Sequence, residues 1–207
     1  VRQDGRSASL TAPNGQAQQG LIIAALSDAA TAADALSLSE AHGTGTALGD
    51  PIEAGSLAGT LLASRGADIL PLAIGGVKAN IGHAEPAAGM TGLLKLGVGL
   101  SSGTAASNAQ FRILNPHLAL AIMGSGCNLP THLSKLGLLV PYTGSVSSFG
   151  YSGTIAHTVL TASDIGFGVP APHIVYRRCR YLWREVQVLE TSAPGTSSAL
   201  GQAIKMT

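Results

Sequence analysis

The stretch EAHGTGTALGDPIEAG (residues 40–55) gathers polar and flexible residues in a chain that is otherwise poor in charge. The segment before it, ALSLSEA (residues 35–41), alternates in part between apolar and polar residues, which indicates a short strand. The segment after it marks a helix start, because Asp50 can act as the N-cap and Pro51 suits the first helical position. Glu53, three residues after that cap, completes the signature. The stretch is therefore predicted to connect a strand to a helix, where open α/β sheets build their sites.

Helices and strands are predicted to alternate on both sides of this connection. Helical spacing of apolar residues occurs over residues 16–28, 54–62 and 87–100, and strands are predicted at 69–77, 145–150 and 155–162. Residues 103–144 carry only a weak pattern. The order helix, strand, helix, strand, helix, long loop and two strands predicts an α/β fold, with helices packed on a mixed sheet.

The segment 87–100 is apolar nearly all round, with Lys95 as its single charge, and such a helix is predicted to be buried. In the segment 69–77, Pro71 is predicted to stand at the beginning of the strand, because proline interrupts a strand interior.

The composition points to a chain with a partner. The 207 residues are 11% charged and 45% apolar and include 27 glycines, whereas soluble domains are typically about 25% charged. We expect a closely packed core of small residues together with a large face buried against another polypeptide.

No feature of the net charge, +1, favours nucleic acid as a partner. One cluster of Arg177, Arg178, Arg180 and Arg184 lies among aromatic residues near the C-terminus and would fit either RNA binding or, as we expect, a linker packed on a domain.

Cys127 and Cys179 are too few for a disulfide framework, so a reducing compartment such as cytoplasm or plastid is expected. No apolar run reaches the ~18 residues of a membrane span. The chain starts at Val1 without a signal-peptide pattern, which fits a piece of a longer protein or a processed product.

His42 and His83 each follow a predicted strand and precede a predicted helix. Two such histidines could converge as hydrogen-bond donors on a developing oxyanion. Lys78, five residues before His83, could orient them or pair with Glu85 at the surface. No paired spacing such as H-x-x-x-H occurs, so a metal site is not expected. By contrast, His157 lies among apolar residues of the last strand and is interpreted as structural.

Five motifs in order make the resemblance specific: TAPNGQAQQ, EAHGTGTALGDPIEAG, VKANIGHAEPAAGMTGLLK, NPHLAL and SVSSFGYSGTIAH. Together they resemble the C-terminal half of a β-ketoacyl synthase domain of the modular type I polyketide synthases. The resemblance covers about residues 3–160, and YRRCRYLWRE resembles the linker that follows such domains. We therefore expect two regions, a ketosynthase half over 1–163 and a linker and tail over 164–207.

The resemblance implies a thiolase-like fold, usually dimeric, that condenses a cysteine-held acyl group with malonyl units on an acyl carrier protein. His42 and His83 match the histidines that assist decarboxylation and stabilise the enolate, and Lys78 matches the lysine that supports them. Thr44 and Thr46 match threonines that contact the phosphopantetheine arm, which is the substrate carrier; no other cofactor is implied. Tyr151 matches a glycine-flanked position whose backbone N–H joins the oxyanion hole.

The chain departs from the family in two ways. The family's nucleophilic cysteine belongs to the N-terminal half, and neither Cys127 nor Cys179 has the expected surroundings. Ile155 stands where the family usually has asparagine. Three states fit: an excerpt of a longer synthase, a separate polypeptide that complements an N-terminal half, or an inactive structural component of a host complex.

Overall fold

The computed structural model describes residues 1–5, 7, 12–66, 68–109, 111–137 and 140–162. The linker and tail predicted for residues 164–207, with the arginine cluster, lie outside the described residues. The boundary between the two predicted regions therefore stays a prediction.

Six strands form one mixed sheet in the order β1-β8-β7-β2-β3-β5. The four strands β7, β2, β3 and β5 run parallel, whereas β8 is antiparallel to β7 and β1 to β8. The mixed α/β sheet predicted from the sequence is confirmed. The strands are β1 (Arg2–Gln3), β2 (Leu36–Glu40), β3 (Leu72–Gly75), β5 (Cys127–Asn128), β7 (Thr143–Phe149) and β8 (Thr154–Thr161).

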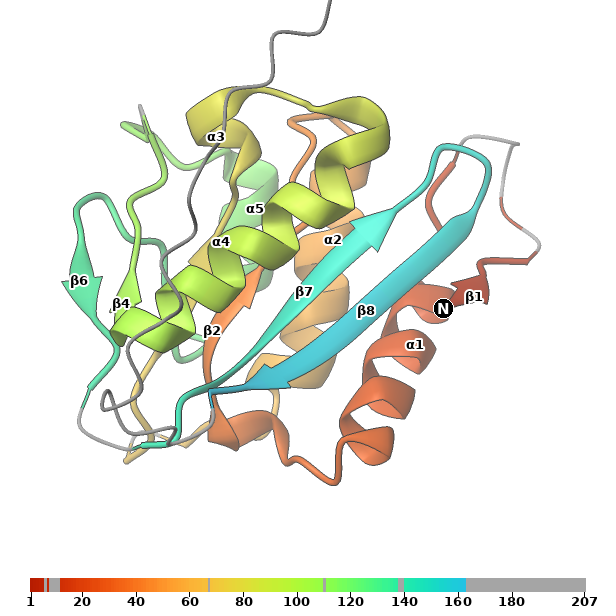
Figure 1. The fold of residues 1–207 in the computed structure, drawn as a ribbon. Helices are drawn as coiled ribbons and strands as arrows, with labels where there is room; N and C mark the ends of the chain where they lie inside the picture. The colour runs from red at the N-terminus through yellow and green to blue at the C-terminus, as the bar shows by residue number, and fades with distance from the viewer. Residues whose placement is uncertain (6, 8–11, 67, 110, 138–139, 163–207) are drawn as a thin grey trace, which may run out of the picture. The chain divides into compact units, whose positions relative to one another are not determined.

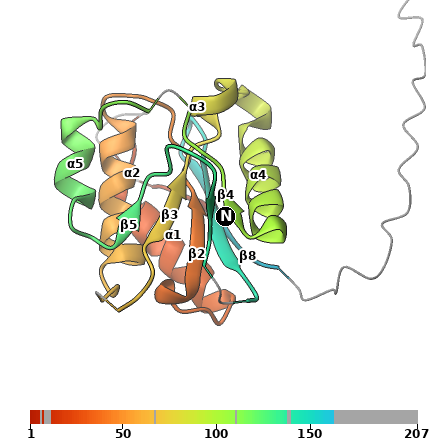
Figure 2. The same cartoon turned by 90° about the vertical axis from the view of Figure 1, so that its left-hand side faces the viewer.

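Helices cover both faces of this sheet (Figures 1 and 2). Helices α1 and α2 lie on one face, with α5 against α2, and α4 lies on the other. The helices are α1 (Gly15–Asp28), α2 (Gly49–Leu57), α3 (Lys78–Ile81), α4 (Ala88–Ser102) and α5 (Pro116–Ile122). A π-helical turn (Ala58–Leu62) continues α2, and 3-10 turns occupy Ala33–Ala35 and Glu85–Ala87. No helix in the described part of the chain has the length and apolar character needed to cross a membrane.

Helix α1 begins one residue before the predicted range. Its N-cap is Asn14, whose side chain accepts a hydrogen bond from the backbone N–H of Ala17 at 3.1 Å, so one of the unsatisfied donors of the first turn is paired. Ile22 and Leu26 of α1 pack with residues of α2, β2 and β3 in one apolar core.

Helix α4 packs on the opposite face, and the prediction that it is buried all round is wrong for this chain. Leu96 and Leu100 are 0% and 3% exposed and pack with residues of β2, β3 and β7. The opposite side of α4 exposes the large apolar residues Met90, Leu94 and Val98. One sheet covers only one side of a helix, so the apolar composition of the other side calls for a second covering surface.

The predicted cap of α2 is also wrong. The helix begins at Gly49, with Leu48 as a cap residue that makes no side-chain hydrogen bond, and Asp50 and Pro51 lie inside it. The acceptor for the first turn is Thr46, whose hydroxyl takes the backbone N–H of Gly49 at 3.1 Å. Asp50 instead accepts from the backbone N–H of Gly45, which holds the preceding loop against the helix.

The weakly patterned region 103–144 contains structure that the sequence did not predict. Helix α5 and strand β5 lie in it, as do β4 (Thr104–Ala105) and β6 (Ser134–Lys135), which pair as a separate antiparallel ribbon. Strands of two residues carry no periodicity that a sequence pattern can reveal. Pro71 does stand directly before β3, as predicted.

Candidate active site

The candidate site lies at the carboxyl edge of the parallel strands β2 and β3. His42 follows the last residue of β2 by two positions, and Lys78 follows the last residue of β3 by three. The Lys78 ammonium donates to the backbone oxygen of His42 and lies 3.4 Å from its Nδ1. Because neighbouring parallel strands end at the same edge, two segments distant in sequence meet here.

His83 joins this pair, as the sequence predicted. The ring centroids of His42 and His83 are 6.0 Å apart and their planes cross at 89°. His42 is half-buried, whereas His83 is exposed. The expected proximity of the two imidazoles, with Lys78 beside them, is thus confirmed. The Lys78 ammonium contacts His42 rather than Glu85.

Hydrogen bonds select the same tautomer in both histidines. Nδ1 of His42 faces the Lys78 ammonium, and Nδ1 of His83 accepts the backbone N–H of Glu85 at 2.8 Å. An ammonium and a backbone N–H are donors only, so each Nδ1 is an acceptor and the proton of each neutral ring resides on Nε2. Both rings therefore offer an Nε2–H donor.

The electrostatics keep His42 neutral. Burial, with electrostatic contributions from Lys78 and His83, lowers the pKa of His42 from 6.5 to about 4. Burial also lowers the pKa of Lys78, against the attraction of Glu53 and Glu40. Phe149, at the end of β7, packs against the His42 ring with centroids 5.4 Å apart, which contributes to the burial of the imidazole.

Glu53 supports the loop that carries His42, and the sequence pointed to a different role for it. Its buried carboxylate accepts the backbone N–H groups of His42 at 2.7 Å and Gly43 at 2.9 Å. Burial raises the pKa of Glu53 to about 7, although these two hydrogen bonds act in the opposite direction. The capping-box spacing correctly identified a residue that reaches back to backbone amides, but those amides precede the predicted cap.

Thr44 and Thr46 lie next to His42, with their hydroxyl oxygens 3.3 Å apart. Tyr151 lies in the turn between β7 and β8 and is 80% exposed. Its exposed ring contrasts with Phe149 two residues earlier, which touches His42. The ring nearest the histidines is therefore Phe149, which the sequence analysis did not single out.

The β7–β8 hairpin is regular although Ile155 replaces the expected asparagine. Ile155 is 3% exposed and pairs with Phe149 across the hairpin. The turn is closed by hydrogen bonds from Gly150 N to Thr154 O and from Gly153 N to Gly150 O. An apolar side chain thus satisfies this position by packing, and the turn needs no amide there.

Cys127 lies away from the histidines. It pairs with Leu72, the first residue of β3, whereas the site follows the last residue of that strand. Burial raises the pKa of its thiol, which opposes formation of the thiolate that a nucleophile requires. Cys179 lies outside the described residues.

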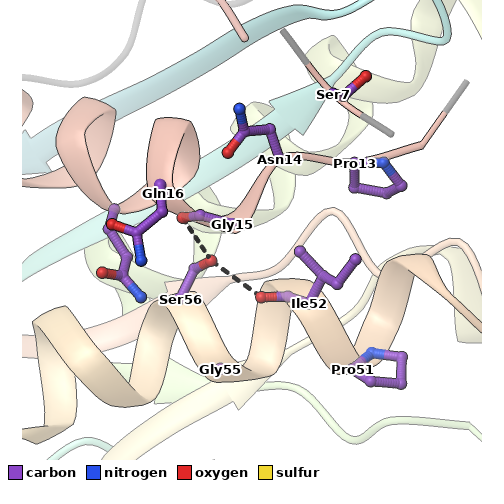
Figure 3. A pocket seen from close by; sticks show the side chains of 10 residues that line it. Ser7, Pro13, Asn14, Gly15, Gln16, Pro51, Ile52, Gly55 and Ser56 are labelled. Carbon is purple, nitrogen blue, oxygen red and sulfur yellow. Dashed lines mark hydrogen bonds between the residues drawn. The ribbon is translucent and has the colours of Figure 1, made fainter. Parts of the chain in front are cut away.

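Two hollows adjoin these elements. An apolar cavity of about 180 Å³ lies behind the His42 loop, lined by Glu53, Leu57 and Ile74 among others, with Leu118 of α5 on its far side. A more open hollow of about 700 Å³ lies between the starts of α1 and α2 (Figure 3). There Ser56 donates to the backbone oxygens of Gly15 and Ile52 and so joins the two helices.

The sequence analysis missed the pairing of two charged residues next to the site. Glu40, at the end of β2, is 1% exposed, and its Oε2 lies 2.6 Å from Nζ of Lys95 in α4. Glu40 is the single charge of its strand and Lys95 the single charge of its helix. These signals could have paired them, because buried charges are almost always partnered.

A match to a family model shows the family of the chain. Residues 1–112, more than half of the chain, match the family described as "Beta-ketoacyl synthase, C-terminal domain". The chain belongs to the β-ketoacyl synthase family. The thiolase-like fold and the ketosynthase relationship expected from the motifs are thereby confirmed.

The similar proteins are polyketide synthases. The chain is 42% identical over 165 residues to a phenolphthiocerol/phthiocerol polyketide synthase polypeptide of Mycobacterium tuberculosis strain H37Rv, and the match covers 77% of this chain and 7% of that protein. The oxazolomycin ketosynthase domain of Streptomyces albus JA3453 has 34% identity and a TM-score of 0.73, covering 83% of this chain and 30% of that one. The ketosynthase from module 6 of the bacillaene synthase of Bacillus subtilis 168 has 34% identity and a TM-score of 0.71, covering 78% and 29%. The chain therefore spans less than a third of each of these relatives.

Proposed function

We propose that this chain supplies the decarboxylation and enolate-binding half of a polyketide-type β-ketoacyl synthase. The observation that carries the proposal is the pair of contacts at the Nδ1 atoms of His42 and His83, with the Lys78 ammonium and the Glu85 N–H, from which the shared Nε2–H tautomer is inferred. The ring centroids of the two imidazoles are 6.0 Å apart, and we infer that both Nε2–H groups donate to one oxygen atom of the substrate. This arrangement suits stabilisation of an oxyanion.

In the proposed reaction the oxygen belongs to a malonyl thioester. Loss of CO₂ breaks the bond from the α-carbon to the carboxylate, and its electron pair forms an enolate whose negative charge lies on the thioester oxygen. His42 and His83 hydrogen-bond that oxygen, and Lys78 keeps the His42 proton on Nε2. The α-carbon then attacks an acyl thioester carbonyl, a carbon–carbon bond forms, and the cysteine thiolate leaves.

The acyl-bearing cysteine is proposed to come from an N-terminal ketosynthase half. Cys127, at the far edge of the sheet with a raised thiol pKa, does not fit the role. We infer that Thr44 and Thr46 receive the phosphopantetheine arm of an acyl carrier protein, and that the backbone N–H of Tyr151 serves the oxyanion of the acyl group.

The exposed side of α4 is the proposed contact for that half. Met90, Leu94 and Val98 recur every four residues and are 58%, 62% and 69% exposed. Covering a side chain of this kind stabilises by about 1.5–3 kcal/mol. A helix-bearing face of a second α/β half supplies the complementary apolar surface, and a heterodimer or larger oligomer follows.

The test combines the chain with an N-terminal ketosynthase half that carries the cysteine. Acyl- and malonyl-carrier proteins are added, and the ketoacyl product and CO₂ are measured separately. Neither half alone is expected to give product, and the mixture is expected to do so. His42→Ala or His83→Ala should lower both rates by about 10²–10³-fold, which is typical for loss of one oxyanion donor.

The matched control is His132→Ala, which removes an exposed histidine between β5 and β6 and should leave the rates unchanged. Product from this chain alone that is lost in Cys127→Ala would overturn the assignment of the nucleophile. A stable complex that releases no CO₂ would instead favour an inactive structural role.

A further inference from the structure

A buried ion pair lies directly beneath the candidate site. Oε2 of Glu40 is 2.6 Å from the Lys95 ammonium, and the side chains of Glu40 and Lys95 are 1% and 18% exposed. The other carboxylate oxygen accepts the backbone N–H of Val77. It is the one ion pair present among the described residues, and it lies between the sheet and α4.

Stability alone does not account for this pair. The apolar core on this face of the sheet includes Leu38 and Ala73 of the sheet and Leu96 of α4. Taking two charges out of water costs several kcal/mol per ion, and replacement of such a pair by apolar residues is often neutral or stabilising. The alternative explanation is that the pair fixes the relative positions of the segments that carry the site.

The carboxylate of Glu40 joins the three segments that carry the site. Glu40 is two residues before His42, and Val77 is the residue before Lys78. Lys95 belongs to α4, which begins five residues after His83. A change in any of these contacts would move one of the three functional side chains relative to the others.

A glycine at the end of β3 leaves the space that the pair occupies. A Cβ on Gly75 would lie 2.6 Å from the Lys95 ammonium and 2.7 Å from Oε2 of Glu40. A Cβ on Gly92 would lie 3.5 Å from Cγ of Glu40. A side chain on Gly75 would therefore collide with the pair, whereas the Gly92 distance is an ordinary contact. The absence of a side chain at Gly75 is independent evidence that the pair is part of a fitted arrangement.

We propose that Glu40 and Lys95 are positioning residues that hold the Lys78 ammonium against Nδ1 of His42 and so fix the His42 proton on Nε2. The pair touches no substrate in this proposal and acts through Lys78. The inference rests on the proposed function for its catalytic consequence, but its structural statement, the tautomer of His42, does not require catalysis.

The decisive experiment removes both charges and keeps the shape. In the full chain, Glu40→Gln/Lys95→Met retains an acceptor for Val77 N–H and leaves no buried charge unpaired. The His42 ring nitrogens are observed by NMR with ¹⁵N-labelled histidine. The wild type should show a protonated Nε2 and an unprotonated Nδ1, whereas the double variant should show a mixture of tautomers with little change in melting temperature.

A matched control separates positioning from stability. Leu100→Ala removes a buried residue further along α4, 3% exposed, and should lower the melting temperature while the His42 signature stays. Lys95→Arg keeps the charge and should preserve the Nε2–H tautomer. In the complex with the N-terminal half, the double variant should lose at least about tenfold in kcat with KM for malonyl-carrier protein unchanged, because misplacement by about 1 Å can cost up to 10²-fold.

An unchanged His42 tautomer in a folded double variant overturns the proposal. If the double variant does not fold, the isosteric single variant Glu40→Gln decides in its place, and an unchanged tautomer there has the same meaning. Failure of the proposed function appears differently, as a wild-type complex without CO₂ release whose His42 signature still responds to these substitutions.

Discussion

Helices α1 and α4 have 14 and 15 residues and pack on opposite faces of one sheet. They differ in how many large apolar side chains they expose. On α1 one large apolar side chain, Ile23, is more than half exposed. On α4 three such side chains are more than half exposed, Met90, Leu94 and Val98, and they lie along one side of the helix. Among the described residues, the outer side of α4 is therefore much more apolar than that of α1, which supports the proposal that α4 contacts a second ketosynthase half.

The inner sides of the two helices differ as well. Helix α1 buries Leu21, Ile22 and Leu26 against the sheet. Helix α4 places glycines inward, and a Cβ on Gly99 would lie 2.8 Å from Cδ2 of Leu38 and 2.9 Å from the backbone oxygen of Thr104. Small residues on its inner side therefore let α4 lie close against the sheet.

The largest expected effect compares two leucines of α4. Leu96→Ala should lower the free energy of unfolding of the chain by about 2–5 kcal/mol, because Leu96 is 0% exposed and its removal leaves a cavity. Leu94→Ala, at 62% exposure, should change it by less than about 0.5 kcal/mol. Urea denaturation of the wild type and the two variants measures both changes.

The order of the two leucines should reverse in partner binding. With an N-terminal ketosynthase half, Leu94→Ala should weaken the complex by at least about tenfold, or 1.4 kcal/mol, as measured by calorimetry. Ile23→Ala on α1, similarly exposed at 58%, is the matched control and should have no effect. Equal losses from the two exposed positions would remove the distinction between the faces.

The next effect tests the α1 face through His157 of β8. Its Nδ1 lies 3.0 Å from the Ser147 hydroxyl, while its Nε2 has no hydrogen-bond partner among the described residues. Burial lowers the pKa of His157 from 6.5 to about 4. The unfolded chain therefore binds the proton more tightly, and the stability from this residue is complete above pH 6.5 and is lost as the pH falls toward 4.

The measurement is the difference between the wild type and His157→Asn. Between pH 7.5 and 4.5 the wild type should lose roughly 2–3 kcal/mol of unfolding free energy relative to the variant, since one pKa unit corresponds to about 1.4 kcal/mol. Glu53, whose raised pKa of about 7 acts in the opposite direction over this range, is present in both proteins and cancels. A constant difference across the range would mean that His157 titrates normally in the folded chain.

Local sequence signals predicted the parts of the fold that depend on neighbouring residues. The bounds of α1 follow from helical spacing, and Pro71 correctly marks the residue before β3. The proximity of His42 and His83 followed from the strand-to-helix positions of both and from the family motifs. The two segments meet because the parallel strands β2 and β3 end at the same edge of the sheet.

Contacts that depend on the register of distant segments were not predictable in the same way. Glu40 and Lys95 are 55 residues apart, and their pairing requires knowing which side of α4 faces β2. The cap of α2 was misplaced because Asp50 and Thr46 both suit a helix start, and only the loop geometry decides between them. Helix α5 went unpredicted, because seven residues are too few for a convincing helical period.

The last comparison concerns two glycines of α4, and its smallest effect is expected at Gly97. Gly97 has no atom within 4 Å of an added Cβ, whereas Gly99 faces Leu38 and Thr104. Gly97→Ala should therefore raise the unfolding free energy of the chain by about 0.5–1 kcal/mol, because alanine loses less backbone entropy in a helix. Gly99→Ala should lower it by about 1–3 kcal/mol through overpacking.

The same substitution at Gly97 should weaken binding of the N-terminal half if that half approaches the helix as closely as the sheet does on the other side. Urea denaturation of each lone chain and calorimetry of each complex give the two values. A Gly97→Ala variant that is more stable alone and binds the half as tightly as the wild type would show that the partner stands off from α4 at this turn, and would restrict the interface to Met90 and Leu94.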